Sequence, residues 1–316
     1  MKKTDSIHYQ REVFEPGLTV VVPVYNRADM VKEMIESVLI QKRPPEALVL
    51  VDDHSTDGTL DVLRIFSEQE LPFELTVLMN RSKGATSARN TGLERVTTEW
   101  TMFFDSDDLM LPEHIETAWS TLLNNRDADI VGWDVERIEI DGRRRVLPFE
   151  SAYPEWSNIM HGTFATQRYM ARTRLFRESG GWNESQPIWN DIELGARLLK
   201  LNPKIGKAES LGPTVKIRAN AASITGDRWS SRIDQYKVAL ENLARVLGPE
   251  KADWIRLKAS VLAADIARED SGAGKSFYKG IPGHDFRTRL VYEWRRHGLR
   301  GAARVFKPLF KGKGET

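Results

Sequence analysis

Residues 18–51, LTVVVPVYNRADMVKEMIESVLIQKRPPEALVLV, contain the pattern that decides the fold. Two short runs of aliphatic and β-branched residues, 18–22 and 47–51, have the length and composition of buried strands. Between them, apolar residues recur one helical turn apart across 30–39, which predicts a helix with one buried face. Pro44-Pro45 ends this helix, because proline cannot continue the hydrogen-bond ladder. The stretch therefore reads as strand, helix, strand.

The same alternation continues to residue 110. We expect a helix over 57–67 with Thr56 as its cap, a strand over 74–79, a helix over 85–95 and a strand over 100–104. Such alternation predicts an α/β fold with a mainly parallel sheet flanked by helices. Ligands of these sheets bind beyond the carboxyl ends of the strands, and this sequence places unusual polar residues there.

Composition excludes several other classes of protein. The chain has 316 residues with 41% hydrophobic and 29% charged residues, which suits a full-sized core. It has no cysteine, so disulfides, thiolate metal sites and cysteine nucleophiles are excluded. A net charge of +1 gives no reason to expect a nucleic acid as partner. We see no secretory signal and no apolar run of membrane-spanning length, and we expect a cytoplasmic bacterial-type protein.

Polar residues follow three of the predicted strands. Residues 105–108 (DSDD) place three carboxylates together, which repel one another unless a cation or hydrogen bonds offset them. Mn²⁺ or Mg²⁺ would do so, and a solvated acidic loop is the alternative. Residues 51–58 (VDDHSTDG) offer a carboxylate to a base or ribose, or simply cap the next helix. Residues 23–27 (PVYNR) offer a ring and donors, or form an ordinary turn.

Four segments together resemble the family 2 glycosyltransferases of the GT-A fold: 22–27 (VPVYNR), 51–59 (VDDHSTDGT), 80–92 (NRSKGATSARNTG) and 104–108 (FDSDD). They occur in that family's order and spacing. The resemblance implies a Rossmann-like, mixed but mainly parallel sheet. It also implies inverting transfer of one sugar from a nucleoside diphosphate sugar, UDP-linked, to an acceptor hydroxyl in bacterial surface polysaccharide or glycan assembly.

The resemblance also implies roles for individual residues. Six would bind the nucleotide sugar: Pro23 and Tyr25 in the nucleotide pocket, Asp53 on the uracil ring, Lys83 and Arg89 beside base and phosphates, and Asp105 on ribose or sugar. Asp107 would ligate a metal, Mn²⁺ or Mg²⁺, that bridges the diphosphate.

A catalytic base is implied further along the chain. Asp191, in 189–194 (WNDIEL) after Gly180-Gly181-Trp182, occupies the place of the family's base, and Glu193 is an alternative. Asn190 stands where the family usually has Glu. At a helix N-terminus, Asp191 would be held ionised by the helix dipole.

Residues 217–225 resemble the family's Tyr-Arg-x-His-x-x-Ser-x-Thr loop, with Asn220 in place of His. Arg218 would lie near the diphosphate or on the surface, and His161 would face the acceptor or be structural. Residues 225–229 (TGDRW) lack the Gln of the processive synthases' Q-x-x-R-W motif, so we expect a non-processive enzyme.

The resemblance divides the chain. We expect an N-terminal extension at 1–16 and a glycosyltransferase domain at 17–225, with a nucleotide-binding half at 17–110 and an acceptor half at 111–225. Residues 226–316 would form a helical C-terminal region. Two rival functions remain: a sugar-phosphate nucleotidyltransferase, although 23–27 lacks its glycine-rich loop, and a scaffold protein with a degenerate site.

The C-terminal region differs from the rest in charge. Residues 270–316 contain 11 Lys and Arg against 4 Asp and Glu. The glycines of 271–283 predict a linker, and 286–310 interleave basic residues with Trp294 and other apolar residues. This basic amphipathic tail would contact the inner membrane, where a lipid-linked acceptor lies, or pack against the catalytic domain.

Overall fold

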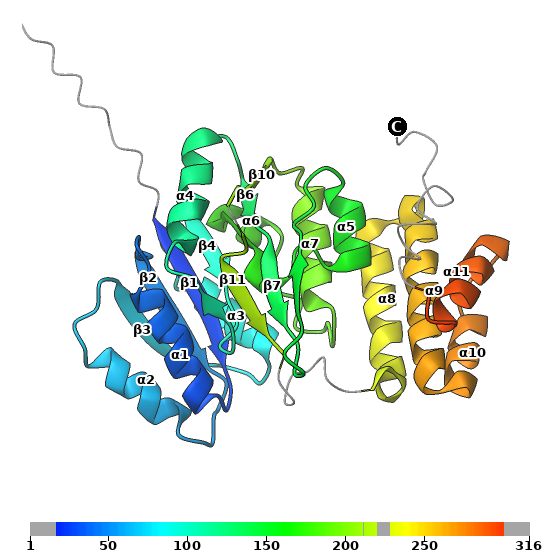
Figure 1. The fold of residues 1–316 in the computed structure, drawn as a ribbon, viewed down its shortest axis with the longest axis horizontal. Helices are drawn as coiled ribbons and strands as arrows, with labels where there is room; N and C mark the ends of the chain where they lie inside the picture. The colour runs from blue at the N-terminus through cyan, green and yellow to red at the C-terminus, as the bar shows by residue number, and fades with distance from the viewer. Residues whose placement is uncertain (1–16, 211, 220–227, 300–316) are drawn as a thin grey trace, which may run out of the picture.

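The computed structural model describes residues 17–210, 212–219 and 228–299, and a seven-stranded sheet forms its centre (Figure 1). The strand order is β10-β6-β9-β4-β1-β2-β3. The strands are β1 (Leu18–Val24), β2 (Ala47–Asp52), β3 (Glu74–Met79), β4 (Trp100–Phe103), β6 (Ile130–Gly132), β9 (Tyr169–Arg172) and β10 (Ile205–Lys207). β3, β2, β1 and β4 are parallel, and β9 is antiparallel to both of its neighbours. The predicted α/β class is confirmed.

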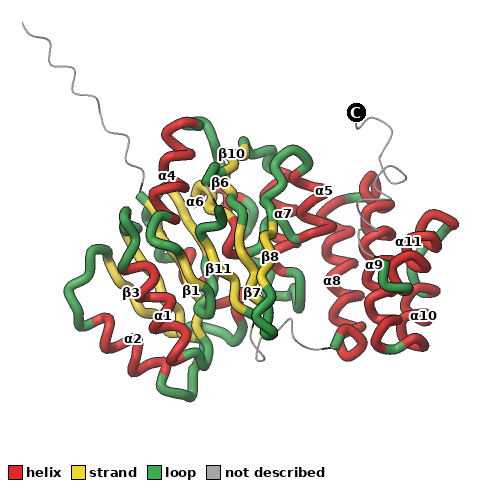
Figure 2. The backbone as a smooth tube through the Cα atoms, in the orientation of Figure 1, coloured by secondary structure: helices red, strands yellow, loops and turns green. Residues whose placement is uncertain are grey.

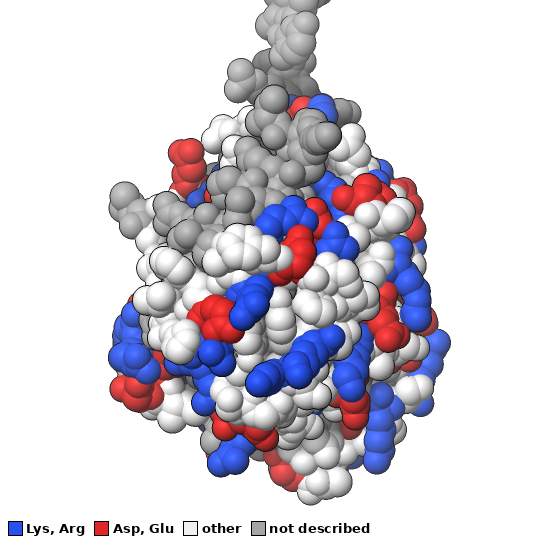
Figure 3. All heavy atoms as spheres, turned by 90° about the vertical axis from the view of Figure 1, so that its right-hand side faces the viewer, with Lys and Arg blue, Asp and Glu red and all other residues white. Residues whose placement is uncertain are grey.

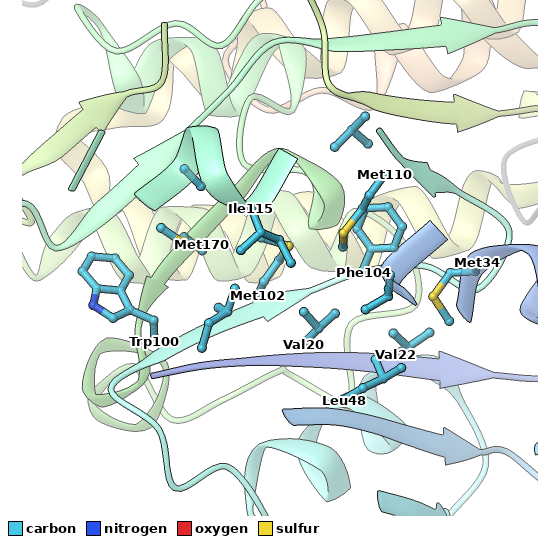
Figure 4. Packing of buried hydrophobic residues seen from close by; sticks show 14 of the residues in the cluster. Val20, Val22, Met34, Leu48, Trp100, Met102, Phe104, Met110, Ile115 and Met170 are labelled. Atoms are coloured by element: carbon cyan, nitrogen blue, oxygen red, sulfur yellow. The ribbon is translucent and has the colours of Figure 1, made fainter. Parts of the chain in front are cut away.

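Helices cover both faces of this sheet. The first face carries α1 (Ala28–Leu39), α2 (Thr59–Ser67) and α4 (His114–Asn124), and the second carries α3 (Ala85–Leu93), α6 (Thr173–Glu178) and α7 (Asn190–Lys200). Successive residues of a strand point to opposite faces. Val20 and Val22 of β1 therefore pack with Met34 of α1 on the first face (Figure 4), and Val21 packs with Ala88 of α3 on the second. Both faces are buried, which explains the unbroken apolar runs in the sequence.

A smaller sheet lies beside the carboxyl edge of the main one. Its order is β5-β11-β7-β8, with β5 (Leu109–Met110), β7 (Val135–Ile138), β8 (Arg144–Leu147) and β11 (Val215–Arg218). β7 and β8 form an antiparallel hairpin that turns at Asp141 and Gly142. Because β11 pairs with β5, the chain returns to the 105–108 loop from more than a hundred residues away.

The described C-terminal residues, 228–299, are helical (Figure 2). They form the 3-10 turns η3 (Trp229–Arg232) and η4 (Pro249–Lys251) and the helices α8 (Ile233–Leu247), α9 (Ala252–Glu269), α10 (Ser271–Lys279) and α11 (Phe286–Arg296). One apolar cluster joins them to α7 and to α5 (Pro154–His161). Within it, the rings of Trp156 and Trp254 meet edge to face with centroids 5.3 Å apart. None of the described helices is long and apolar enough to span a membrane.

The prediction of a linker over 271–283 is wrong. Asp270 caps α10 by accepting a hydrogen bond from the Ala273 N–H at 2.9 Å, and Phe277 is buried. A Cβ on Gly274 would lie 2.4 Å from the Cα of Ala267 on α9. This glycine therefore permits two helices to approach closely, and glycine content alone could not distinguish that role from a flexible linker.

Candidate active site

The loops that follow β1 and β2 are hydrogen-bonded to each other. Asn26 has φ 48° and His54 has φ 62°, the left-handed region that few non-glycine residues adopt. The Asn26 N–H donates to Ser55 Oγ at 3.0 Å, and the Thr56 N–H donates to Asn26 Oδ1 at 2.8 Å. Thr56 is thus not the cap of α2, as the sequence predicted, because Asp57 accepts from the first N–H of that helix instead.

Three residues expected to bind the nucleotide base lie on these loops or beside them. Pro23 is the sixth residue of β1 and is half-buried, and Tyr25 directly beyond the strand is 55% exposed. Asp53 follows β2, where its carboxylate accepts from Asn80 Nδ2 at 2.6 Å and from the Gly84 N–H at 2.8 Å. These bonds hold the loop before α3, in which Lys83 is exposed at the same edge of the sheet.

The acidic loop after β4 is held from two sides. Arg89 on α3 forms an ion pair of 2.7 Å with Asp105, and its guanidinium lies 4.5 Å from the centre of the Trp182 ring. From the other side, Gln167 donates from its amide nitrogen to Asp105 and, at 2.6 Å, to Asp108. The predicted nucleotide residues Arg89 and Asp105 are therefore in direct contact.

The carboxylates of this loop suit a divalent cation. Asp105, Asp107 and Asp108 each offer an oxygen, and these oxygens lie within 4.8 Å of one another. Burial first, and then the charges of Asp105 and Asp107, raise the pKa of Asp108 well above its ordinary value. A bound cation would offset this crowding of negative charge, and oxygen ligands are those that Mg²⁺ and Mn²⁺ prefer. Arg27 lies 3.9 Å from Asp107.

Arg218, at the end of β11, contacts the same loop. Its N–H donates to Asp108 Oδ1 at 2.8 Å, its Nε donates to the carbonyl of Asp107 at 2.5 Å, and its guanidinium pairs with Glu33. Its side chain is about one-fifth exposed. It is therefore not an isolated surface arginine. The rest of the predicted loop motif, residues 220–225, lies outside the described residues.

Asp191 lies in the first turn of α7, partly buried, where its Oδ1 accepts from the Ile192 N–H at 2.9 Å. Burial is the largest influence on its pKa and raises it. The hydrogen bond and the charge of Arg89 oppose the shift, and Asp105 adds to it. The expectation that the helix dipole holds Asp191 ionised stays a prediction, and burial acts against it by raising the pKa. A raised pKa makes a carboxylate a better proton acceptor.

The two other residues near this end of the molecule have different surroundings. Glu193 is 2% exposed, and Arg197 binds both of its oxygens at 2.9 and 2.7 Å, which fits a structural ion pair. His161 ends α5, where part of its side chain reaches solvent. Partial burial, followed by the charges of Lys258 and Arg168, lowers its pKa.

Sequence reasoning missed three neighbours of these residues: Gln167, Trp189 and Lys258. Gln167 bridges two acids from a 3-10 turn that no motif marks. Trp189 precedes α7 in the left-handed conformation, and Lys258 reaches it from α9. Only the three-dimensional fold brings them together, so no pattern in the sequence could have found them.

Comparison with known proteins places this chain in a family. The model of "Glycosyl transferase family 2" matches residues 19–182, which contain all four strand-end motifs. This chain belongs to glycosyl transferase family 2. It is therefore a glycosyltransferase, as the resemblance implied.

Two relatives show how far the similarity extends. An uncharacterized glycosyltransferase of Rickettsia prowazekii (strain Madrid E) is 22% identical over 96% of this chain and 99% of its own length. The putative teichuronic acid biosynthesis glycosyltransferase TuaG of Bacillus subtilis (strain 168) is 35% identical, over 33% of this chain and 40% of its own.

Two solved structures share the fold. S. aureus TarS 1-349 in complex with UDP-GlcNAc has a TM-score of 0.59 and 16% identity, covering 92% of this chain and 90% of that one. The mannosyltransferase PcManGT from Pyrobaculum calidifontis, in complex with GDP-Man and Mn²⁺, has a TM-score of 0.59 and 16% identity, covering 94% and 84%. At this identity the likeness concerns the fold, and it confirms the GT-A expectation.

Proposed function

We propose that this glycosyltransferase moves one sugar from a UDP-sugar to an acceptor hydroxyl with inversion, and that Asp191 is the catalytic base. The observation that carries the proposal is electrostatic. Asp191 is partly buried, its pKa is raised, and it senses the charges of Arg89 on α3 and Asp105 after β4. The proposed base is thus coupled to two residues that we expect to bind the donor.

The chemistry follows from that position. Asp191 accepts the proton of the acceptor hydroxyl while the oxygen of that hydroxyl forms a bond to the anomeric carbon of the donor sugar. The bond from that carbon to the diphosphate oxygen breaks on the opposite face, so an α-linked donor gives a β-linked product. Asp107, with Asp105 and Asp108 beside it, would hold Mn²⁺ or Mg²⁺, which supplies positive charge to the leaving diphosphate.

Similar proteins support the choice of donor and product. TarS has been crystallised with UDP-GlcNAc and with UDP. TuaG is named for teichuronic acid biosynthesis, and a relative of Bacillus spizizenii that is 31% identical over 118 residues is a poly(ribitol-phosphate) beta-glucosyltransferase. We therefore propose a role in bacterial cell-surface glycan assembly.

Calorimetric titration of UDP tests the donor site, first with Mn²⁺ and then with EDTA. Binding that depends on the metal would support the Asp107 site and lead to a screen of UDP-sugars for slow hydrolysis. If UDP failed to bind in both conditions, the UDP proposal would be wrong, and GDP would be titrated next. If no nucleotide bound, the scaffold alternative would be favoured. Among the described residues, Asn190 supports that alternative, because it stands where the family usually has Glu.

We also propose that α11 places the enzyme at the cytoplasmic face of the inner membrane, near a lipid-linked acceptor. Val291 and Tyr292 of α11 are buried. Phe286, Leu290 and Trp294 lie about one turn apart from one another along another face of α11. These three residues are 73%, 37% and 37% exposed. Figure 3 shows the side of the molecule where these helices lie, with Lys and Arg side chains interspersed with uncharged surface and some acids. Basic, aromatic helix faces bind anionic membranes.

Cosedimentation with vesicles tests this contact. The wild type should bind vesicles containing an anionic lipid and bind neutral vesicles less. Leu290→Glu should weaken the binding, whereas Leu123→Glu, at a 50% exposed position on α4, should not. Equal loss in both variants, or no binding by the wild type, would contradict the proposal.

A further inference from the structure

Lys258 belongs to the C-terminal helix α9, yet its ammonium group reaches the start of α7. Its Nζ lies 4.6 Å from the centre of the Trp189 ring. α7 packs against α8, and α5 packs against α9, which brings these helices to the end of α7 that carries Asp191 (Figure 1). The C-terminal region therefore contributes a cation to the surroundings of the proposed base.

Trp189 holds an unusual backbone conformation at this point. Its φ of 54° and ψ of 33° are left-handed, which bulky side chains rarely adopt. Such conformations cost free energy and concentrate at functional sites. The Trp189 ring also contacts the ring of Tyr236 of α8, with centroids 4.9 Å apart. The ring beside Lys258 thus has contacts from both α8 and α9.

Lys258 has no counter-ion in the part of the chain that the structure describes. No acid in residues 17–210, 212–219 or 228–299 lies within ion-pair distance of its Nζ. Asp265, on the same helix, is bound instead by Arg295 through hydrogen bonds of 2.9 and 3.1 Å. Burial lowers the pKa of Lys258 to about 8, against the charges of Asp191 and Asp265. A partly desolvated cation that is balanced by an aromatic ring and by no described acid gains from an anionic ligand.

Arg168, another cation coupled to Asp191, already makes hydrogen bonds. Arg168 is 3% exposed and donates to the backbone carbonyls of Gly162, Leu147 and Pro148. The charge of Asp191 is thus coupled to Arg89 and Asp105, which are the expected donor residues, and to Arg168 and Lys258. Of the latter two, Arg168 keeps only its buried Nε without a partner, whereas Lys258 makes no hydrogen bond to the described residues.

We infer that Lys258 binds a negatively charged group of the acceptor, a phosphate or a carboxylate, beside the ring of Trp189. The C-terminal helices would then complete the acceptor side of the site. An ammonium is a compact point charge with three donors and accepts either anion. This inference rests on the proposed role of Asp191 as the base.

The test uses the indole N–H signals of the UDP-saturated protein in NMR spectra, with the Trp189 signal identified by Trp189→Phe. Glycerol 3-phosphate and glucuronate are the anionic probes, and glycerol and glucose are their neutral counterparts. The Trp189 signal should shift saturably with an anionic probe and not with a neutral one. Which anionic probe binds more tightly distinguishes phosphate from carboxylate.

Lys258→Met removes the charge and keeps the apolar stem. It should raise the dissociation constant of the anionic probe about tenfold, the usual effect of losing a hydrogen bond between charged groups. Lys251→Met is the matched control, because Lys251 also lies over a tryptophan ring, at 4.0 Å from Trp254, but already pairs with Glu155. This control should leave probe binding unchanged.

Three results would overturn the inference: no shift with either anion, equal shifts with neutral probes, or unchanged affinity in Lys258→Met. Calorimetry of UDP on the same variants keeps the two proposals apart. If Lys258→Met weakened UDP binding as much as probe binding, Lys258 would belong to the donor side and the inference would be wrong. If the wild type did not bind UDP, the donor proposal would fail. The anionic probes would then be titrated into nucleotide-free protein, so that the inference about Lys258 is still tested.

Discussion

The proposed base Asp191 is partly buried and has a raised pKa, and its charge is coupled to Arg89 and Asp105. Asp191→Asn should lower turnover by about 10²- to 10⁴-fold, the usual contribution of general acid–base catalysis, and leave UDP affinity unchanged. Product formation from a UDP-sugar and calorimetry of UDP measure the two effects. Normal turnover in this variant would remove Asp191 from the mechanism. Glu193→Gln, which breaks the ion pair with Arg197, should lower stability more than turnover.

The same carboxyl group should make stability depend on pH. Its pKa is raised in the folded state, so the native protein binds this proton more tightly than the unfolded chain. Its contribution to the free energy of unfolding therefore falls as pH rises from the ordinary Asp value of 3.8 through the raised value. Asp191→Asn should therefore have a higher melting temperature than the wild type at neutral pH. The difference should disappear in acid, where the Asp191 carboxyl group of the wild type is protonated.

Asp141 provides the control for that pH dependence. Hydrogen bonds from Arg143, from its backbone first, lower the pKa of Asp141 in the folded state. Its charge therefore favours folding above the ordinary value, and Asp141→Asn should show no gain at neutral pH. A gain of equal size in both variants would mean that burial of Asp191 is not the cause.

Asp107 should decide the effect of metal on donor binding. Asp107→Asn removes one negative charge from the acidic cluster and should reduce UDP affinity in Mn²⁺ to the value in EDTA. Asp141→Asn, in the exposed turn of the β7–β8 hairpin, should retain the full effect of Mn²⁺. Calorimetry with and without metal measures both variants. If Mn²⁺ still raised the UDP affinity of Asp107→Asn by the full amount, Asp107 would not be a ligand of the metal.

At the scale of the elements, the contact between α9 and α10 depends on one glycine. Gly274→Ala would place a Cβ 2.4 Å from the α9 backbone, and we expect it to cost about 1–3 kcal/mol in the free energy of unfolding. Gly272→Ala, on the same helix, meets only Asp270 Oδ1 at 3.4 Å. It should be neutral or stabilising by up to about 1 kcal/mol, because alanine favours helix. Denaturant unfolding compares the two, and equal effects would contradict this account.

At the scale of the whole molecule, the C-terminal helices share with α5 and α7 the apolar cluster that contains Trp156 of α5 and Trp254 of α9. We expect one cooperative thermal transition, and Trp254→Ala should lower its midpoint as a whole, with a cost of about 3–5 kcal/mol. Leu123→Ala, at an exposed position, should change it little. Circular dichroism during heating measures this. Two separate transitions in the wild type would show that the C-terminal helices fold independently.

Local patterns determined the sheet and the residues at its carboxyl edge. The β-branched runs at 18–22 and 47–51 form β1 and β2, because strands buried on both faces must be apolar throughout. The motifs that follow them lie at one edge because the carboxyl ends of parallel strands coincide. Arg89 and Asp105, predicted separately, form an ion pair there.

Tertiary structure decided what depends on distant segments. The pKa of Asp191 follows from burial, which its position at a helix start could not reveal. Gly274 proved to be a packing contact because its meaning depends on the partner helix. Lys258 reaches Trp189 only because α9 packs beside α5. Sequence spacing specifies local conformation, whereas desolvation and charge at a site are sums over neighbours that the fold alone brings together.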